Sequence, residues 1–405
     1  MGDSDTKRWM YVIFTFIIFI CSGSVYNWSM FRIPLEQLFS ISPIYSLLPF
    51  MLLFVMIVFS FILSTSLVKK HSIRLIIFIG CILYSMGWIT CFIVTDMLLL
   101  TISFGVFCGV GTGILMNGLM TVIARWFPDE RGGAIGITLF GAGISPVITA
   151  PILQTLIDSS GVLTAMGLFG GGILVIMLLC CIPMKLPVAG WTPQKNSNKQ
   201  LPTEDVKSSL NDSIRFWPLW ICFFIGIVTG FMAVGTSSSF GQEIFGLSAG
   251  MSSLYLGWFA FCGASSRVAY GYLFDKKGIR YSMMMILIIL LIGTLIISLF
   301  LSTQSIWVFL ITFSIFWSCF SGLFTLVMSC KGQVSWKKIS LPLHHALFTA
   351  IGASAIISTI FEGLASTSIK TYTTLFTILL ALTFFGLILS FFTIKHIKTK
   401  PTPSQ

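Results

Sequence analysis

The sequence predicts an all-α integral membrane protein, in which twelve transmembrane helices form two pseudo-symmetric halves of six. Three observations predict this fold class. Hydrophobic residues make up 56% of the 405 residues and charged residues only 9%, whereas a soluble domain has about 25% charged residues. Apolar runs of about 20 residues, the length that crosses a bilayer as a helix, recur along the chain. The basic residues lie between these runs, as expected for cytoplasmic loops.

The predicted helices fall into two groups of six. We expect them at residues 9–31, 44–66, 75–95, 97–124, 132–157, 162–184, 216–241, 250–274, 281–302, 304–329, 341–366 and 371–394. The one long polar segment, 185–215, is rich in Pro, Ser, Asn and Lys, a composition typical of a flexible linker. It separates an N-terminal half, 1–184, from a C-terminal half, 216–405. The first apolar run is too long for a cleaved signal peptide, so we expect it to be a membrane helix.

The distribution of Lys and Arg predicts the topology. With both termini in the cytoplasm, 21 of the 24 basic residues fall in cytoplasmic segments, and only Arg32 and Lys370 fall outside. The remaining one, Arg267, lies within a predicted helix. Such a bias orients a membrane protein, and one helix more or fewer would scramble it. We therefore expect a multi-pass protein of the cell membrane, either a plasma membrane or a bacterial inner membrane.

Several functions are disfavoured by what the sequence lacks. The net charge of +11 comes from short loop clusters, so it does not indicate nucleic-acid binding. The ten cysteines are scattered without metal-ligand spacing, so we expect no metal and no cofactor. No glycine-rich loop is followed by Lys-Ser/Thr, which argues against an ATP-driven pump. No carboxylate pair, Ser/His dyad or His-rich cluster is visible within the predicted helices, so we expect no enzyme.

Four segments resemble a known family. The run Gly271-Tyr-Leu-Phe-Asp-Lys-Lys-Gly-Ile-Arg280 resembles the cytoplasmic-loop signature of the major facilitator superfamily, and residues 65–74 repeat its basic turn, with Lys69 where the signature has Asp. Residues 22–28, 125–136 and 216–220 resemble the oxalate/formate antiporter and monocarboxylate carrier branch. The resemblance implies a secondary active or facilitative transporter working by alternating access. It also implies gating loops that contain Arg125, Asp129, Arg131, Asp275, Lys276, Gly278 and Arg280.

Arg267 is the leading candidate for a substrate contact. It lies eight residues before Asp275, which places it about 12 Å inside the membrane at 1.5 Å per residue. A guanidinium at that depth is expected to face a cavity and a negative partner, and its planar fork matches a carboxylate. The alternative is an internal salt bridge or a bond to a main-chain carbonyl, although no acidic residue is predicted at that depth. The resembled branch also places an arginine at this position.

The positions around this arginine favour a substrate with one carboxylate. By resemblance, dicarboxylate-exchanging members carry a lysine where this chain has Gly352, and tyrosines where it has Met116 and Ala142. Proton-coupled monocarboxylate carriers carry an aspartate where this chain has Gly263. We therefore expect lactate-, formate- or pyruvate-like acids. Exchange, facilitated diffusion and coupling through the bound acid itself stay open.

Four further residues are candidates for the cavity lining: Tyr26, Asn117, Trp317 and Ser321. Asn117 lies eight residues before Arg125 and so about as deep as Arg267, and its amide needs a partner from the substrate or from a neighbouring helix. By resemblance Trp317 aligns with an aromatic that contacts substrate, although packing would also explain it, as it would Tyr26. Ser321 donates a hydrogen bond either to substrate or to another helix.

The sequence thus predicts a membrane transporter of small organic anions, with the lipid bilayer as its other partner and no nucleic acid. We expect a monomer. Two alternatives stay open, namely an oxalate or dicarboxylate antiporter and an exporter of other amphipathic molecules with the same fold. A deep arginine speaks against cationic drugs as cargo.

Overall fold

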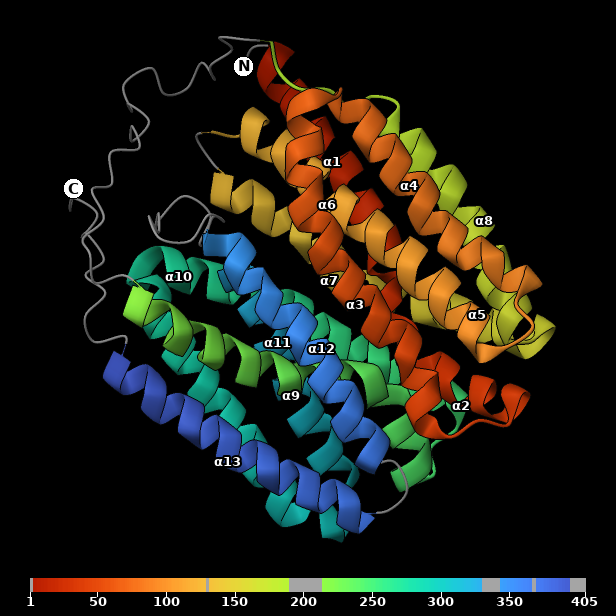
Figure 1. Ribbon diagram of the computed structural model, residues 1–405, viewed down its shortest axis with the longest axis vertical. Coiled ribbons are helices and arrows are strands. Elements are labelled where there is room, and N and C mark those ends of the chain that lie inside the picture. The colour runs from red at the N-terminus through yellow and green to blue at the C-terminus, as the bar shows by residue number, and fades with distance from the viewer. Residues whose placement is uncertain (1–2, 129–130, 189–212, 330–342, 366–368, 394–405) are drawn as a thin grey trace.

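The computed structural model of the chain is a bundle of helices over the residues that it describes, which are 3–128, 131–188, 213–329, 343–365 and 369–393. Figure 1 shows the helices before residue 185, coloured red to yellow-green, on one side of the molecule, and those after residue 213, coloured green to blue, on the other. The first group contains α1 (Asp3–Ser22), η1 (Gly23–Asn27), α2 (Trp28–Phe39), α3 (Pro43–Lys70), α4 (Ile73–Ile89), η2 (Thr90–Ile93), α5 (Met97–Ile102), η3 (Ser103–Cys108), α6 (Gly109–Trp126), α7 (Arg131–Ser160) and α8 (Val162–Cys181).

The second group contains α9 (Ser213–Phe245), α10 (Ala249–Phe300), η4 (Leu301–Thr303), α11 (Ile306–Ser329), α12 (Leu343–Ala365) and α13 (Ile369–Thr393). Most of the predicted linker, 185–215, lies outside the described residues. Each of the twelve predicted spans falls on a helical segment, so the predicted fold class is confirmed. The division into halves moving as domains stays a prediction.

Within the described chain, eleven helical segments are long and apolar enough to cross a membrane. The predicted span that is not among them, 250–274, is the first part of α10, which carries Arg267 and four serines. The helix continues through Gly278 into the next predicted span. Gly278 has φ 76° and ψ 175°, a conformation that glycine adopts readily and other residues do not. This one residue therefore joins two membrane helices within α10.

The first predicted helix is irregular. It changes at Gly23 into the short 3-10 segment η1 and resumes as α2, which ends at Phe39 and not at residue 31. Gly23 packs directly against the carbonyl of Ala142 on α7, where a Cβ would have no room. This close approach explains why a glycine stands at the break. A second irregularity, the π-helical η3, interrupts the predicted span 97–124, and such π-bulges are often found at functional sites.

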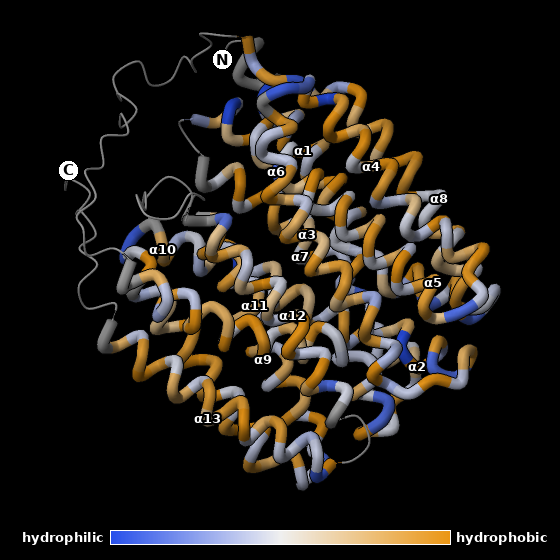
Figure 2. Tube along the Cα trace, viewed as in Figure 1, coloured by the Kyte–Doolittle hydropathy of each residue, from blue (hydrophilic) through white to orange (hydrophobic). Residues whose placement is uncertain are grey.

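The outer surface of the bundle is apolar. Large hydrophobic side chains such as Phe59, Leu98 and Trp307 are 60%, 70% and 67% exposed. Figure 2 shows hydrophobic residues along the length of the helices and hydrophilic residues mainly near their ends. A water-soluble protein does not expose so much contiguous apolar surface, whereas helices with internally satisfied backbones suit a lipid environment. The chain is a multi-pass integral membrane protein.

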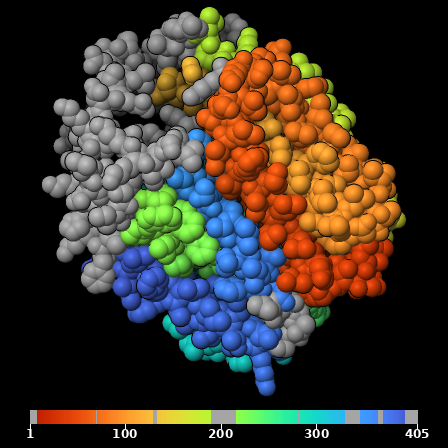
Figure 3. Space-filling view, viewed as in Figure 1, coloured from red at the N-terminus to blue at the C-terminus, as the bar shows by residue number. Residues whose placement is uncertain are grey.

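The two groups of helices meet along a seam made mainly by three helix pairs, namely α2 with α9, α3 with α12, and α7 with α10. Figure 3 shows the blue band of α12 running beside the red-orange band of α3. Small residues line this seam. Gly143 of α7 faces Ala264 of α10, and Gly352 of α12 faces Val58 of α3. Small side chains let membrane helices pack closely, and the polar groups described next lie along this seam.

Candidate functional site

Arg267 lies in the first part of α10 and is buried in the seam, with its side chain 1% exposed. Its Nη1 donates a 2.5 Å hydrogen bond to the main-chain carbonyl of Leu139 on α7. Its Nε is buried and has no hydrogen-bond partner among the described residues. The guanidinium carbon lies 5.7 Å from the ring centroid of Phe324. A buried donor without a partner costs about 1–3 kcal/mol, so Arg267 keeps a binding capacity that a ligand oxygen can use.

The helices α7 and α10 approach each other closely beside this arginine. A Cβ on Gly143 would lie 2.9 Å from the Cα of Ala264 and 3.2 Å from Nε of Arg267. A side chain at position 143 would therefore push the helices apart or displace the guanidinium. Leu139 lies one helical turn before Gly143. A carbonyl oxygen has two lone pairs, so that of Leu139 can accept from Arg267 in addition to its bond within α7.

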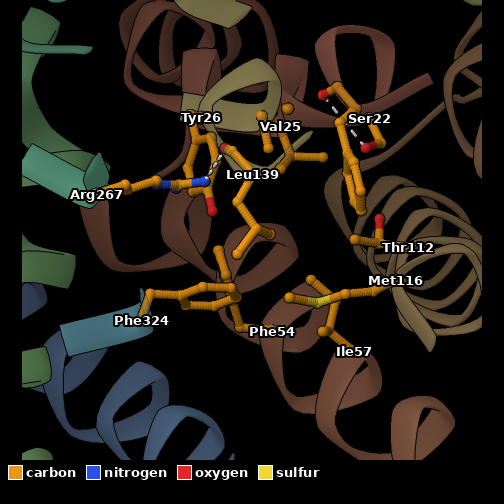
Figure 4. A pocket seen from close by; sticks show the side chains of 13 residues that line it. Ser22, Val25, Tyr26, Phe54, Ile57, Thr112, Met116, Leu139, Arg267 and Phe324 are labelled. Atoms are coloured by element: carbon orange, nitrogen blue, oxygen red, sulfur yellow. Dashed lines mark hydrogen bonds between the residues drawn. The ribbon is translucent and has the colours of Figure 1, made fainter. Parts of the chain in front are cut away.

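A cavity of about 30 Å³ lies beside Arg267, which is room for about two water molecules. Figure 4 shows residues of both helix groups around it, with Arg267 reaching in from α10 toward Leu139. Its walls are formed by Phe19, Ser22, Gly23, Val25, Tyr26, Phe54, Ile57, Thr112, Met116, Leu139, Ala142, Arg267 and Phe324. Arg267 is the charged member of this set, and no Asp or Glu belongs to it. One cation among apolar walls is complementary to a small anion with an apolar remainder.

Of the five predicted substrate contacts, Arg267 and Tyr26 line this cavity. Trp317 lies behind Tyr26, with the two ring centroids 6.2 Å apart at an angle of 67°. Its indole Nε1 donates a 2.8 Å hydrogen bond to Ser237, and its side chain is only 2% exposed. Ser321 lies against Gly263 of α10. In this arrangement Trp317 supports Tyr26 from behind, and direct contacts of Trp317 and Ser321 with substrate stay predictions.

Asn117 lies in α6 and is turned toward α3. Its Nδ2 donates hydrogen bonds of 3.0 Å to Ser64 and to Thr65. The hydroxyl of Thr65 is in turn 3.0 Å from Nε2 of His345 on α12. The neighbouring helix, one of the two partners that the sequence left open, therefore satisfies the Asn117 amide. This chain of hydrogen bonds crosses the seam between α3 and α12, on the predicted cytoplasmic side of the cavity.

The structure shows what surrounds the positions at which, by resemblance, different carboxylate carriers have different residues. Met116 and Ala142 both line the cavity, so the tyrosines expected there by resemblance are replaced by smaller or more flexible groups at the site itself. A Cβ on Gly352 would lie 3.4 Å from Val58, so a side chain there would enter the seam. A Cβ on Gly263 would lie 2.8 Å from the hydroxyl of Ser321. The packing at position 263 therefore leaves no room for an aspartate.

The predicted gating residues lie at the ends of helices. Arg125 is exposed at the end of α6, and Arg131 begins α7. Asp275 and Arg280 lie on either side of Gly278 in α10, and the ammonium of the exposed Lys276 lies 4.5 Å from the ring centroid of Tyr272. The remaining residue of the set, Asp129, lies outside the described residues. Their role in gating stays a prediction.

A second buried arginine lies at the predicted outer end of the seam. Arg32 of α2 is 0% exposed, and its Nη1 donates a 2.6 Å hydrogen bond to Ser239 of α9. Its Nε lies 3.3 Å from the hydroxyl of Ser46 on α3, and its Nη2 lies 3.4 Å from Glu36. The sequence placed Arg32 between two spans. That placement is wrong, because α2 continues to Phe39 and turns Arg32 into the seam. The spacing of Arg32 and Glu36, four residues apart on one helix face, was the available signal.

The bundle of two helix groups around a central cavity with one buried cation is the architecture of a membrane transport protein. Residues 12–335 match the family model described as Major Facilitator Superfamily. The chain belongs to the Major Facilitator Superfamily, which confirms the resemblance seen in its loop motifs.

Individual relatives are distant. The chain is 26% identical over 283 residues to the oxalate:formate antiporter of Oxalobacter formigenes, a match that covers 69% of this chain and 66% of that protein. It is 29% identical over 135 residues to monocarboxylate transporter 12 of Mus musculus, covering 33% of this chain and 28% of that protein. The matched regions thus span less than two thirds of either relative.

One solved structure shows the shared fold. It is the crystal structure of a bacterial homolog to the human lysosomal transporter Spinster, in an inward-facing and occupied conformation, with a TM-score of 0.69. The alignment covers 98% of this chain and 99% of that chain at 13% sequence identity. At this identity the likeness shows the arrangement of the helices alone.

Proposed function

We propose that this protein transports small organic anions with a single carboxylate, such as lactate-, formate- or pyruvate-like acids, across a cell membrane by alternating access. The observation that carries the proposal is the state of Arg267. Its guanidinium is buried beside a cavity that both halves line, and its Nε is left without a partner in the described chain. A substrate carboxylate is the group that a guanidinium fork accepts best.

The charge balance supports one carboxylate per substrate. The lining holds one cation and no Asp or Glu, so one carboxylate neutralises it. The second head of a dicarboxylate would lie among apolar walls, and an unpaired charge in such surroundings is costly. Met116, Ala142 and Phe54 offer contacts for a hydrogen or a short aliphatic remainder.

The relatives support a carboxylate as the substrate, but they differ in whether it carries one carboxyl group or two. One relative is an oxalate:formate antiporter and another a monocarboxylate transporter. The longer match, to the antiporter, favours dicarboxylate exchange as a second candidate. Gly352 argues against it, because this chain has no cation at the position where dicarboxylate exchangers carry their second one. We further propose that the protein acts as a monomer in a plasma or inner membrane, with both termini in the cytoplasm, since the basic residues gather in segments on one side.

Transport by reconstituted protein tests this proposal. Proteoliposomes of the wild type should take up labelled lactate or formate, and unlabelled monocarboxylates should compete better than oxalate. Arg267→Ala should reduce uptake to the level of protein-free liposomes, because a buried ionic anchor is lost. The matched control is Arg74→Ala, since Arg74 also donates to a main-chain carbonyl, that of Met184, but is exposed at a helix end.

Two results would contradict the proposal. Transport by Arg267→Ala at the wild-type rate would show that Arg267 is a structural strut. Stronger competition by oxalate than by lactate would favour the dicarboxylate antiporter instead.

A further inference from the structure

Tyr84 of α4 contacts the irregular part of the first membrane helix through its hydroxyl group. Its side chain is fully buried. The hydroxyl oxygen lies 3.0 Å from the main-chain carbonyl of Ser22, 3.1 Å from that of Cys21 and 2.8 Å from Oγ of Ser24. Ser24 in turn donates a 2.8 Å hydrogen bond to the carbonyl of Cys21. Two buried hydroxyl groups therefore bind the carbonyls at the point where α1 ends and η1 begins.

These contacts stabilise the 3-10 conformation of η1. An α-helix bonds each N–H group to the carbonyl four residues back, and a 3-10 helix to the carbonyl three residues back. Because the 3-10 hydrogen bonds have poorer geometry, such segments are uncommon beyond three or four residues, and η1 has five. A carbonyl oxygen has two lone pairs, so those of Cys21 and Ser22 can accept from a hydroxyl in addition to a main-chain N–H. The hydroxyl of Tyr84 offsets part of the cost of the irregular segment.

Tyr84 is itself held by the neighbouring helix α6 and by η3. Gly111 packs directly against its backbone, because a Cβ there would lie 2.7 Å from Cα of Tyr84. Sγ of Cys108, the last residue of the π-helical η3, donates a 3.3 Å hydrogen bond to the carbonyl of Tyr84. Thr112 and Met116, which follow in α6, line the cavity. The irregular segments η1 and η3 thus both contact Tyr84, and each is continuous with residues of the cavity wall.

The conformation of η1 determines the direction in which Tyr26 points. Successive residues turn by about 100° in an α-helix and by about 120° in a 3-10 helix. Over the three steps from Gly23 to Tyr26 this difference adds up to about 60°, so an α-helical segment would turn Tyr26 away from its present direction. Tyr26 and Arg267 line the same cavity (Figure 4), and Tyr84 is not among the lining residues. Any influence of Tyr84 on the cavity therefore passes through other residues.

We propose that Tyr84 is a positioning residue, whose hydroxyl holds η1 in the 3-10 conformation and thereby directs Tyr26 toward the substrate. The inference rests on the proposed function and deepens it, because it assigns a part in substrate affinity to a residue outside the cavity. The effect of Tyr84 passes through a side chain that contacts the substrate. It therefore falls on the KM and not on the maximal rate.

Transport kinetics of Tyr84→Phe in proteoliposomes test the inference. This variant keeps the ring and removes the hydroxyl. We expect the KM for lactate to rise about three- to tenfold, as for the loss of one neutral hydrogen bond, at nearly the wild-type maximal rate. Ser24→Ala removes the second hydroxyl and should raise the KM as well. The matched control is Tyr11→Phe, at a buried tyrosine of α1 whose ring stacks on Trp126, and it should keep the wild-type KM.

A double-mutant cycle determines whether the effect passes through Tyr26. In a Tyr26→Ala background, Tyr84→Phe should leave the KM unchanged, because the side chain that Tyr84 directs is absent. A merely structural role of Tyr84 would change the KM or the maximal rate by the same factor in both backgrounds.

Hydrogen–deuterium exchange of the detergent-solubilised protein needs no substrate. Tyr84→Phe should speed the exchange of the amides of residues 23–28 and leave those of α4 at wild-type rates, whereas Tyr11→Phe should change neither. The inference is overturned if Tyr84→Phe keeps the wild-type KM, if its effect on the KM is the same without Tyr26, or if the amides of residues 23–28 exchange as in the wild type. Should the wild type transport no monocarboxylate, the proposed function fails, and the exchange rates still decide whether Tyr84 holds η1.

Discussion

The two buried arginines of the seam differ in how completely they are bound. Arg32 and Arg267 are 0% and 1% exposed, and each donates from one half of the molecule to the other. The guanidinium of Arg32 is surrounded by two hydroxyl groups, of Ser46 and Ser239, and by the carboxylate of Glu36. The guanidinium of Arg267 has one hydrogen bond, to the carbonyl of Leu139, and lies beside the Phe324 ring and the cavity. Its Nε has no hydrogen-bond partner among the described residues.

The comparison shows that burial of a charge does not by itself indicate a binding site. A guanidinium in which each nitrogen has a partner stabilises a contact, and one with an unpartnered nitrogen is available to a ligand. By this criterion Arg32 holds the predicted outer end of the seam together, whereas Arg267 is the arginine that we propose binds the substrate. The two roles predict different consequences of substitution.

The largest expected effect is on stability, from Arg32→Gln. Removing the cation leaves Glu36 partly buried without its partner, and breaking such a pair costs about 3 kcal/mol or more. We expect a clear drop in the thermal unfolding temperature of the detergent-solubilised protein, with the KM for substrate nearly unchanged. Lys370→Gln, at an exposed basic residue on the same predicted side, should leave the unfolding temperature as it is. If Arg32→Gln raised the KM without lowering the unfolding temperature, the two arginines would not have the different roles inferred for them.

The next effect is on substrate affinity, from Arg267→Lys. The charge is kept but the planar fork is lost, and lysine cannot bind Leu139 and a carboxylate in the same way. We expect a loss of about 1–2 kcal/mol in apparent binding, or roughly tenfold or more in KM, with stability close to wild type. Arg74→Lys serves as the exposed control. Full activity of Arg267→Lys would mean that only the charge matters at this position.

The smallest effect is expected from Gly143→Ala. The new methyl group would lie 3.2 Å from Nε of Arg267 and closer still to Ala264, and overpacking of this kind costs typically about 1–3 kcal/mol. Part of that strain is relieved by a shift of the guanidinium, so we expect a several-fold higher KM. Gly136→Ala on the same helix meets open space and should transport normally. Equal behaviour of the two variants would argue that Arg267 is not held in place by α7.

Much of the fold was predictable because its signals are local. Apolar runs and loop charges predict the helices and their number, and the run from Gly271 to Arg280 predicts the superfamily that residues 12–335 confirm. The irregular segments η1 and η3 were not predicted. At η1 the backbone lies against residues far along the chain, as Gly23 lies against Ala142. A hydropathy pattern depends on local composition, so it cannot predict which distant backbone a glycine will pack against.

The site was predictable only in part, for a related reason. The depth of Arg267 within a predicted membrane helix marks it as a candidate. Its partner Leu139 contributes only a main-chain carbonyl, which any residue type could supply, so no sequence pattern points to it. Arg32 lies near a predicted helix end, where charges are usually hydrated. Its burial follows from the continuation of α2 and from the packing of α2 against the second half, and neither is a local property of the sequence.

The hydrogen bond from Arg267 to Leu139 has a consequence for the empty protein. While no ligand is bound, this bond links α10 to the backbone of α7 and so opposes movement of the two helices relative to each other. If a substrate carboxylate binds Arg267 as proposed, it replaces this bond, and the Leu139 carbonyl keeps its bond within the helix. The proposed substrate contact and the restraint on the empty protein would then depend on the same guanidinium, so the protein would rearrange more readily with substrate than without it.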